Sequence, residues 1–101
     1  MAIELKSLDQ LKTMRRAGLL VAQTLAQVRN AIKPGMTTSA LDAVAAANIK
    51  RGGGISNFFG YHGYPATICV SINDEIVHGI PGDRIINEGD IVSVDCGAEI
   101  D

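Results

Sequence analysis

The chain has 101 residues, of which 47% are hydrophobic and 20% are charged. This length fits one ordinary domain at most, and the composition is that of a globular protein, which excludes a disordered tail and a collagen-like repeat. Nine basic and eleven acidic residues give a formal net charge of −2, so nucleic acid and anionic membranes are poor partners.

The first part of the chain is predicted to be a long helix. Apolar residues recur at every third or fourth position across residues 7–31, and Ser7 with Gln10 can form a capping box at the start. The Lys-Pro-Gly segment at 33–35 should end this helix. The positions expected to face the core are Leu8, Leu11, Met14, Gly18, Val21, Leu25 and Val28.

A second helix is predicted next, because Thr37 or Thr38 can cap its start. The three consecutive glycines at 52–54 should end it, since glycine makes helix continuation costly. Its apolar face would include Leu41, Val44, Ala45 and Ile49.

Beyond the glycines the residue preferences change to extended structure. We expect strands at 55–59, 66–72, 75–78 and 91–98, separated by turns rich in Asn, Asp, Gly and Pro. Two helices followed by an antiparallel-type sheet give an α+β class. The last strand would leave an open apolar edge close to Asp101, and proteins normally cover such edges. We therefore expect either a second chain to cover it or, as the favoured alternative, the sequence to be part of a longer protein.

Charge placement also bears on the cellular compartment. The first ten residues carry Glu4 and Asp9 and lack the apolar core of a secretory signal. Charges also interrupt the helical region, which therefore lacks the about 18 apolar residues of a membrane span. These charges are Arg15, Arg16, Arg29 and Lys33. A cytoplasmic location is expected, in which Cys69 and Cys96 are reduced, buried thiols rather than a disulfide.

The two histidines occupy similar local settings. His62 and His78 each begin a His-Gly-x-Pro unit, in which glycine frees the backbone and proline fixes φ. Such a unit can hold a side chain in a defined direction on a rigid loop. The alternative is a pair of surface turns that happen to contain histidine.

Asp95 interrupts an otherwise apolar predicted strand. A buried carboxylate must be paired, protonated or bound to a metal, because an unpaired buried charge is costly. The alternative is a solvated carboxylate at the end of a strand. No HExxH, CxxC, GxSxG or phosphate-binding pattern accompanies it.

All four aromatic residues fall within seven positions: Phe58, Phe59, Tyr61 and Tyr64. They can form a hydrophobic cluster under a loop, or an apolar pocket beside the histidines with Cys69 as part of its wall. Both outcomes are compatible.

Four segments resemble the methionine aminopeptidases of the bacterial type I class: KPGMTT, GYHGYP, ICVSINDEIVHGIP and DIVSVDCG. The resemblance implies the pita-bread (creatinase/aminopeptidase) fold. Residues 1–101 would be the N-terminal part of a single catalytic domain that is incomplete at its C-terminus. It also implies a metalloaminopeptidase that removes the initiator methionine from nascent proteins when the second residue is small.

The same resemblance implies roles for individual residues. Asp95 matches a metal-bridging aspartate, His78 matches a histidine that contacts the scissile amide, and His62 matches a second histidine at the pocket entrance. The positions that match the methionine pocket are Phe58, Tyr61, Tyr64 and Cys69, with Phe58 bulkier than in some members. The other metal ligands of the family would lie beyond Asp101, so no activity is expected from the 101 residues alone.

The resemblance further implies two divalent metal ions (Co, Mn, Fe or Zn) and nascent polypeptide N-termini at the ribosome as substrates. It implies a cytoplasmic monomer when complete, with neither nucleic acid nor membrane as a partner. Three other interpretations stay open: a non-enzymatic relative with a binding role, a proline-specific peptidase of the same fold, and a scaffold domain without a site. Asp95 and His78 argue against the first, and the two His-Gly-x-Pro units argue against the other two.

Overall fold

The computed structural model describes residues 5–74 and 79–100, with the backbone alone for His62. Helix α1 (Leu8–Ala31) begins with the predicted capping box. The Ser7 hydroxyl accepts a hydrogen bond from the Gln10 N–H at 3.1 Å, and the Gln10 side chain accepts one from the Ser7 N–H at 2.7 Å. The predicted first helix is therefore confirmed at both ends.

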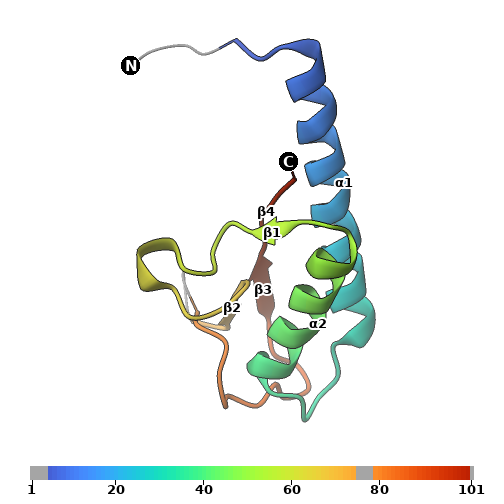
Figure 1. Cartoon of the computed structure of the whole chain (residues 1–101). Helices are drawn as coiled ribbons and strands as arrows, with labels where there is room; N and C mark the ends of the chain where they lie inside the picture. The colour runs from blue at the N-terminus through green and yellow to red at the C-terminus, as the bar shows by residue number, and fades with distance from the viewer. Residues whose placement is uncertain (1–4, 75–78, 101) are drawn as a thin grey trace.

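The apolar face predicted for α1 is largely wrong: of its seven positions, Val28 is buried and Val21 is half-buried. Leu8 is 68% exposed and Met14 is 55% exposed, and Leu11 and Leu25 are exposed as well. The buried residues of the helix are Leu20, Thr24 and Val28. Figure 1 shows the N-terminal half of α1 extending beyond α2 and the strands. Apolar periodicity identifies a face of a helix, but burial also requires an element packed against that face.

Helix α2 (Thr38–Arg51) begins as predicted, with the Thr37 hydroxyl accepting a hydrogen bond from the Ala40 N–H at 3.1 Å. It ends at Gly52, which confirms the predicted glycine stop. Its buried positions are Thr38, Leu41, Ala45 and Ile49. The predicted apolar face is thus confirmed, with Val44 half-buried at its margin.

The interface between the two helices includes a buried hydrogen bond and a close approach at Gly52. The Asn48 side-chain amide donates a hydrogen bond to the Thr24 hydroxyl at 2.8 Å, so the buried threonine is satisfied inside the interface. A Cβ added at Gly52 would collide with the side chain of Leu20. Glycine at this position therefore allows the end of α2 to approach α1 closely.

Two short antiparallel sheets lie beside the helix pair (Figure 1). Strand β1 (Ile55–Ser56) pairs with β4 (Ala98–Glu99), and β2 (Cys69–Ile72) pairs with β3 (Val92–Asp95). A short 3-10 helix, η1 (Tyr61–Gly63), lies between β1 and β2. All of β2 is buried. It pairs with β3, Gly79 bonds to Val70 and Ser71, and its apolar side chains belong to the core cluster.

Three of the predicted strands need correction. The strand expected at 55–59 has only two residues, because the chain then turns into η1. The strand expected at 91–98 is divided at Gly97 into β3 and β4, which pair with different partners. A Cβ at Gly97 would lie 2.8 Å from the Asn57 side chain, so this glycine permits the change of partner. The strand expected at 66–72 is confined to β2, and the segment expected at 75–78 lies outside the described residues.

The core lies between the helices and β2. Its buried members are Val28, Leu41, Ala45, Ile68, Val70, Ile72 and Ile86. Half-buried apolar residues of β3 pack against this cluster. The exposed fraction of Ile91, just before β3, is 71%, and within the described residues β3 has β2 as its only strand partner.

A carboxylate joins the residue that follows β2 to the residues that precede β3. Asp90 accepts hydrogen bonds from the Asn87 N–H at 2.8 Å and from the Asn73 side chain at 3.0 Å. Asn73 has φ of 54° and also accepts the Ile91 N–H at 2.9 Å. The hydrogen bond from the Asn87 backbone, followed by that from Asn73, lowers the pKa of the Asp90 carboxyl.

Replacing Asn73 with alanine is expected to raise the pKa of Asp90, since it removes one of these two donors. Asp90 has a lower pKa in the folded chain than in the unfolded chain. Its stabilisation is therefore present above the ordinary Asp pKa and is lost as the pH falls through the folded-state value. An NMR titration of the side-chain carboxyl carbon measures the change, with Asn30→Ala on the exposed surface of α1 as the control. An unchanged Asp90 midpoint in Asn73→Ala would contradict the assignment.

Candidate functional site

A cavity of about 410 Å³ opens between the η1 loop and the start of β2. Its lining residues are Phe58, Tyr61, Gly63, Tyr64, Pro65, Cys69 and Ile80. The lining is mainly aromatic and aliphatic, which is typical of small-molecule pockets. Four residues predicted from the sequence to form one apolar pocket, namely Phe58, Tyr61, Tyr64 and Cys69, are therefore brought together.

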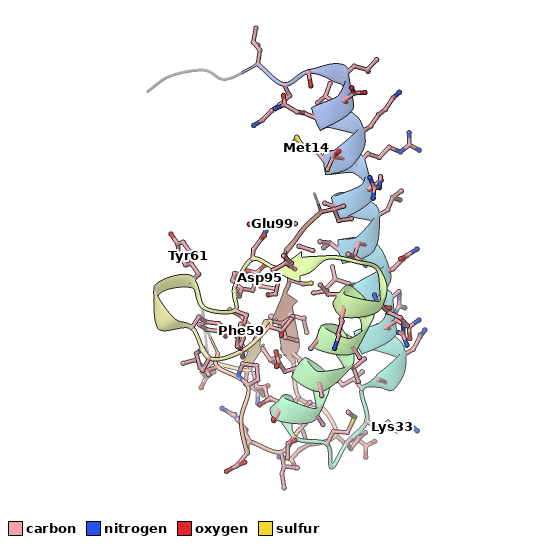
Figure 2. The ribbon with its side chains drawn as sticks, in the orientation of Figure 1. Met14, Lys33, Phe59, Tyr61, Asp95 and Glu99 are labelled. Atoms are coloured by element: carbon pink, nitrogen blue, oxygen red, sulfur yellow. The ribbon has the colours of Figure 1, made fainter. Side chains whose placement is uncertain are left out.

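The loop that carries the aromatic residues is shaped by two glycines in the left-handed region. Gly60 has φ of 82° and Gly63 has φ of 78°, and residues with a Cβ rarely adopt these angles. The loop closes through a hydrogen bond from the Gly60 N–H to the Tyr64 carbonyl at 2.9 Å. Figure 2 shows Tyr61 projecting from this loop, and its side chain is 66% exposed. Tyr61 therefore forms the rim of the cavity.

Tyr64 and Phe58 form the inner part of the wall. Their ring centroids lie 5.9 Å apart with the planes tilted by 55°, an arrangement favoured by aromatic quadrupoles. The Tyr64 hydroxyl donates a hydrogen bond to the Ile68 carbonyl at 2.9 Å. Burial raises the pKa of Tyr64, and so do a hydrogen bond with Cys69 and the nearby negative charges. The phenol therefore stays protonated at neutral pH and acts as a hydrogen-bond donor.

Phe59, the fourth aromatic residue, does not line the cavity, and its side chain is 67% exposed. Two other lining residues belong to the His-Gly-x-Pro units: Pro65 is the proline of the first unit, and Ile80 follows the glycine of the second. The sequence pattern singled out those units for their histidines. In the described structure, it is the apolar residues of these units that line the cavity.

Asp95 is the last residue of β3, directly opposite Cys69 in the antiparallel register. Its side chain is exposed, so the structure has the solvated carboxylate at a strand end rather than a buried one. Because β3 alternates, Val94 faces the core while Asp95 faces away from it. Figure 2 shows Asp95 at the end of the strand near β4, which carries Glu99.

The thiols were expected to be reduced, and both Cys69 and Cys96 are free in the structure. Cys69 is buried as expected, whereas Cys96 is half-buried. Burial, followed by the charge of Asp95, raises the pKa of the Cys96 thiol to about 11. The Cys96 thiol is therefore protonated at neutral pH.

The described residues do not by themselves form a metal centre. Within residues 5–74 and 79–100, no group of three or more His, Cys, Asp or Glu side chains lies close enough to hold a metal ion. Asp95 is a carboxylate of the type that binds hard divalent cations, but a single exposed carboxylate competes poorly with water. His78 lies outside the described residues, and for His62 the structure gives only the backbone within η1.

Asp42 and Ser56 contribute to the site but were not singled out by the sequence. Asp42 accepts two backbone N–H groups from the segment before β2, and Ser56 donates a hydrogen bond to the same segment. An aspartate within a helix and a serine before a loop are ordinary features of a sequence. No local signal could have linked them to a cavity formed by other parts of the chain.

The α-helices of the described part are α1 and α2. In residues 5–74 and 79–100, none is long and apolar enough to cross a bilayer.

The chain belongs to metallopeptidase family M24, which it matches over residues 12–101. Methionine aminopeptidase 1 of Bacillus subtilis is 47% identical over 95 residues, which cover 94% of this chain and 38% of that protein. Methionine aminopeptidase of Clostridium acetobutylicum is 50% identical over 97 residues, which cover 95% of this chain and 39% of that protein.

A solved structure gives the same result for the fold. The crystal structure of methionine aminopeptidase from Thermotoga maritima matches with a TM-score of 0.94 and 39% sequence identity. The match covers 98% of this chain and 40% of that chain. The α+β class and the pita-bread fold expected from the sequence are therefore confirmed. The chain spans about two fifths of the length of these relatives.

Proposed function

We propose that this chain forms part of a methionine aminopeptidase and that its cavity receives the side chain of an N-terminal methionine. The observation that carries the proposal is the convergence of Phe58, Tyr61, Tyr64 and Cys69 on one apolar cavity of about 410 Å³. A flexible, unbranched thioether suits such a cavity. Contacts between sulfur and aromatic rings add about 0.3–1.5 kcal/mol each. The names of the curated relatives support the same substrate.

The proposal assigns a role to each candidate residue. Phe58, Tyr64 and Cys69 form the wall around the methionine side chain, and Tyr61 covers its exposed end. His78 contacts the scissile amide and His62 lies at the pocket entrance, roles that rest on the sequence resemblance. A neutral histidine that donates a hydrogen bond to developing negative charge is worth about 2.7–4 kcal/mol in comparable sites.

Asp95 is proposed as a metal ligand. Family M24 is a metallopeptidase family, and metal ions in such enzymes supply a water of lowered pKa. The proposed cofactor is a pair of divalent ions (Co, Mn, Fe or Zn). The described residues offer Asp95 alone, so the remaining ligands must come from outside the part that the structure describes.

The finer biological assignments follow from the same proposal. The substrates are nascent polypeptide N-termini that carry an initiator methionine followed by a small residue, met at the ribosome in the cytoplasm. The complete enzyme is a monomer. The net charge of −2 supports a partner other than nucleic acid or an anionic membrane.

The test is a hybrid in which this chain replaces the matching part of the Bacillus subtilis relative. We expect the hybrid to release methionine from Met-Ala-Ser with a kcat/KM at least about tenfold higher than for leucine from Leu-Ala-Ser, because a shaped apolar pocket discriminates by that order. Asp95→Asn in the hybrid should abolish release and lower the bound metal measured by elemental analysis.

Two results would overturn the proposal. One is a folded, metal-loaded hybrid that releases no methionine. The other is a hybrid that prefers Ala-Pro-Ser to Met-Ala-Ser, which would identify a proline-specific peptidase instead.

A further inference from the structure

The carboxylate of Asp42, on helix α2, binds the backbone of the two residues that precede β2. Asp42 lies in the second turn of α2 and is half-buried. Its Oδ1 atom accepts hydrogen bonds from the N–H of Thr67 at 2.8 Å and from the N–H of Ile68 at 2.9 Å. Thr67 is 8% exposed and Ile68 is fully buried. Two buried backbone donors are thus satisfied by one charged acceptor, which makes both hydrogen bonds stronger than neutral ones.

The carbonyl groups of the same two residues accept hydrogen bonds from one side chain that lines the cavity and from one that does not. The Ile68 carbonyl accepts the hydrogen bond from the Tyr64 hydroxyl at 2.9 Å. The Thr67 carbonyl accepts one from the Ser56 hydroxyl at 2.7 Å. The dipeptide 67–68 is therefore held on one side by α2 and orients wall residues on the other side.

Ser56 extends this network to the second aromatic ring. Its oxygen accepts a hydrogen bond from the Phe58 N–H at 3.1 Å, so the backbone of Phe58 is tied to the Thr67 carbonyl through one hydroxyl. Cys69 directly follows the dipeptide and lines the same cavity. Tyr64 is thus connected to Asp42 through two hydrogen bonds and Phe58 through three. Cys69 is connected to Asp42 through one hydrogen bond and one peptide bond.

We propose that Asp42 is a positioning residue that fixes the shape of the cavity wall and so determines which N-terminal side chain the cavity accepts. The proposal rests on the proposed function, because the accepted side chain is taken to be methionine. Asp42 is absent from the cavity lining and acts through the 67–68 backbone. Side chains on a wall that is not held in place sample more than one arrangement, and such a pocket discriminates less between unbranched and branched ligands.

The first test measures the hydrogen bonds directly in the 101-residue chain by amide hydrogen exchange. Asp42→Ala should accelerate exchange at Thr67 and Ile68 by about tenfold or more relative to the core amide of Val70. Asp42→Asn keeps an oxygen acceptor without the charge, so it should give a smaller acceleration. Asp9→Asn, an exposed carboxylate in the first turn of α1, is the matched control and should change neither amide. Unchanged exchange at both amides in Asp42→Asn and Asp42→Ala would overturn the proposal.

The second test measures selectivity in the hybrid enzyme. Asp42→Ala should reduce the ratio of kcat/KM for Met-Ala-Ser over Leu-Ala-Ser by about fivefold or more, with a smaller reduction in Asp42→Asn. Ser56→Ala should lower the ratio as well, while Asp9→Asn should leave it unchanged. A purely structural role would lower the amount of active enzyme and reduce both rate constants equally. A constant ratio in the folded Asp42 variants would therefore overturn the proposal.

The two tests separate this inference from the proposed function. If the unmodified hybrid is folded but does not release methionine, the proposed function fails, and the exchange rates at Thr67 and Ile68 still decide whether Asp42 holds the wall. If Asp42→Ala does not fold, Asp42→Asn supplies both measurements.

Discussion

Replacing Gly79 with alanine is expected to destabilise the folded chain by about 3 kcal/mol or more, one of the largest effects of any single substitution here. A Cβ at this position would collide with the carbonyl oxygen of Val70 and lie 2.9 Å from the Cα of Ser71. The obstacle is backbone, which cannot move aside as a flexible side chain can. Gly79 also exchanges hydrogen bonds with β2: its carbonyl accepts the Val70 N–H at 2.8 Å, and its N–H donates to the Ser71 hydroxyl at 3.1 Å.

Urea unfolding followed by circular dichroism measures this effect. Gly18→Ala is the matched control, because a Cβ at Gly18 meets nothing within 4 Å and the residue is exposed on α1. Alanine there should stabilise the chain by up to about 1 kcal/mol, since it is the better helix former. The same substitution thus has opposite signs at the two sites. Equal stabilities of Gly79→Ala and the unmodified chain would contradict the close approach to β2.

Replacing Ile68 with alanine is expected to cost about 2–5 kcal/mol, the range for deleting a large aliphatic side chain from a core. Ile68 is fully buried and belongs to the cluster that joins α2 to β2. Its backbone also connects Asp42 to Tyr64. The lost contacts and the new cavity therefore weaken the core directly beneath the aromatic wall.

Thermal unfolding provides the measurement for Ile68→Ala. For a domain of this size, each 1 kcal/mol lowers Tm by about 4–8 °C. Ile91→Ala is the control, because the Ile91 side chain is 71% exposed and its loss should change stability by no more than about 0.5 kcal/mol. Similar Tm values for the two variants would show that Ile68 is not the core residue the structure assigns.

The helices could be predicted because their signals are local. The Ser7 capping box, the Thr37 cap and the stop at Gly52 each involve residues within one or two turns of one another. A helix also satisfies its backbone groups within its own segment. A strand cannot satisfy its backbone groups within its own segment, since it needs a partner strand that is distant in sequence. That is why the continuous strand expected at 91–98 is divided at Gly97, where the pairing changes from β2 to β1.

The candidate site shows the same division. Its aromatic residues were predictable, because Phe58, Tyr61 and Tyr64 lie within seven positions and share a motif with Gly63. Asp42 was not predictable, because its partners at 67 and 68 lie 25 and 26 residues away. The roles of His62 and His78 remain predictions, since their side chains lie outside the described part.

The sequence by itself determined the two helices and their caps, the change to extended structure after the glycines, and the family to which the chain belongs. Only the tertiary structure decided which face of α1 is buried, how the last strand divides, and that Asp95 is exposed while Asp42 is bonded to the cavity segment. Local patterns record what a residue prefers within its own segment, whereas burial and long-range hydrogen bonds depend on which other segment is present at that point in space.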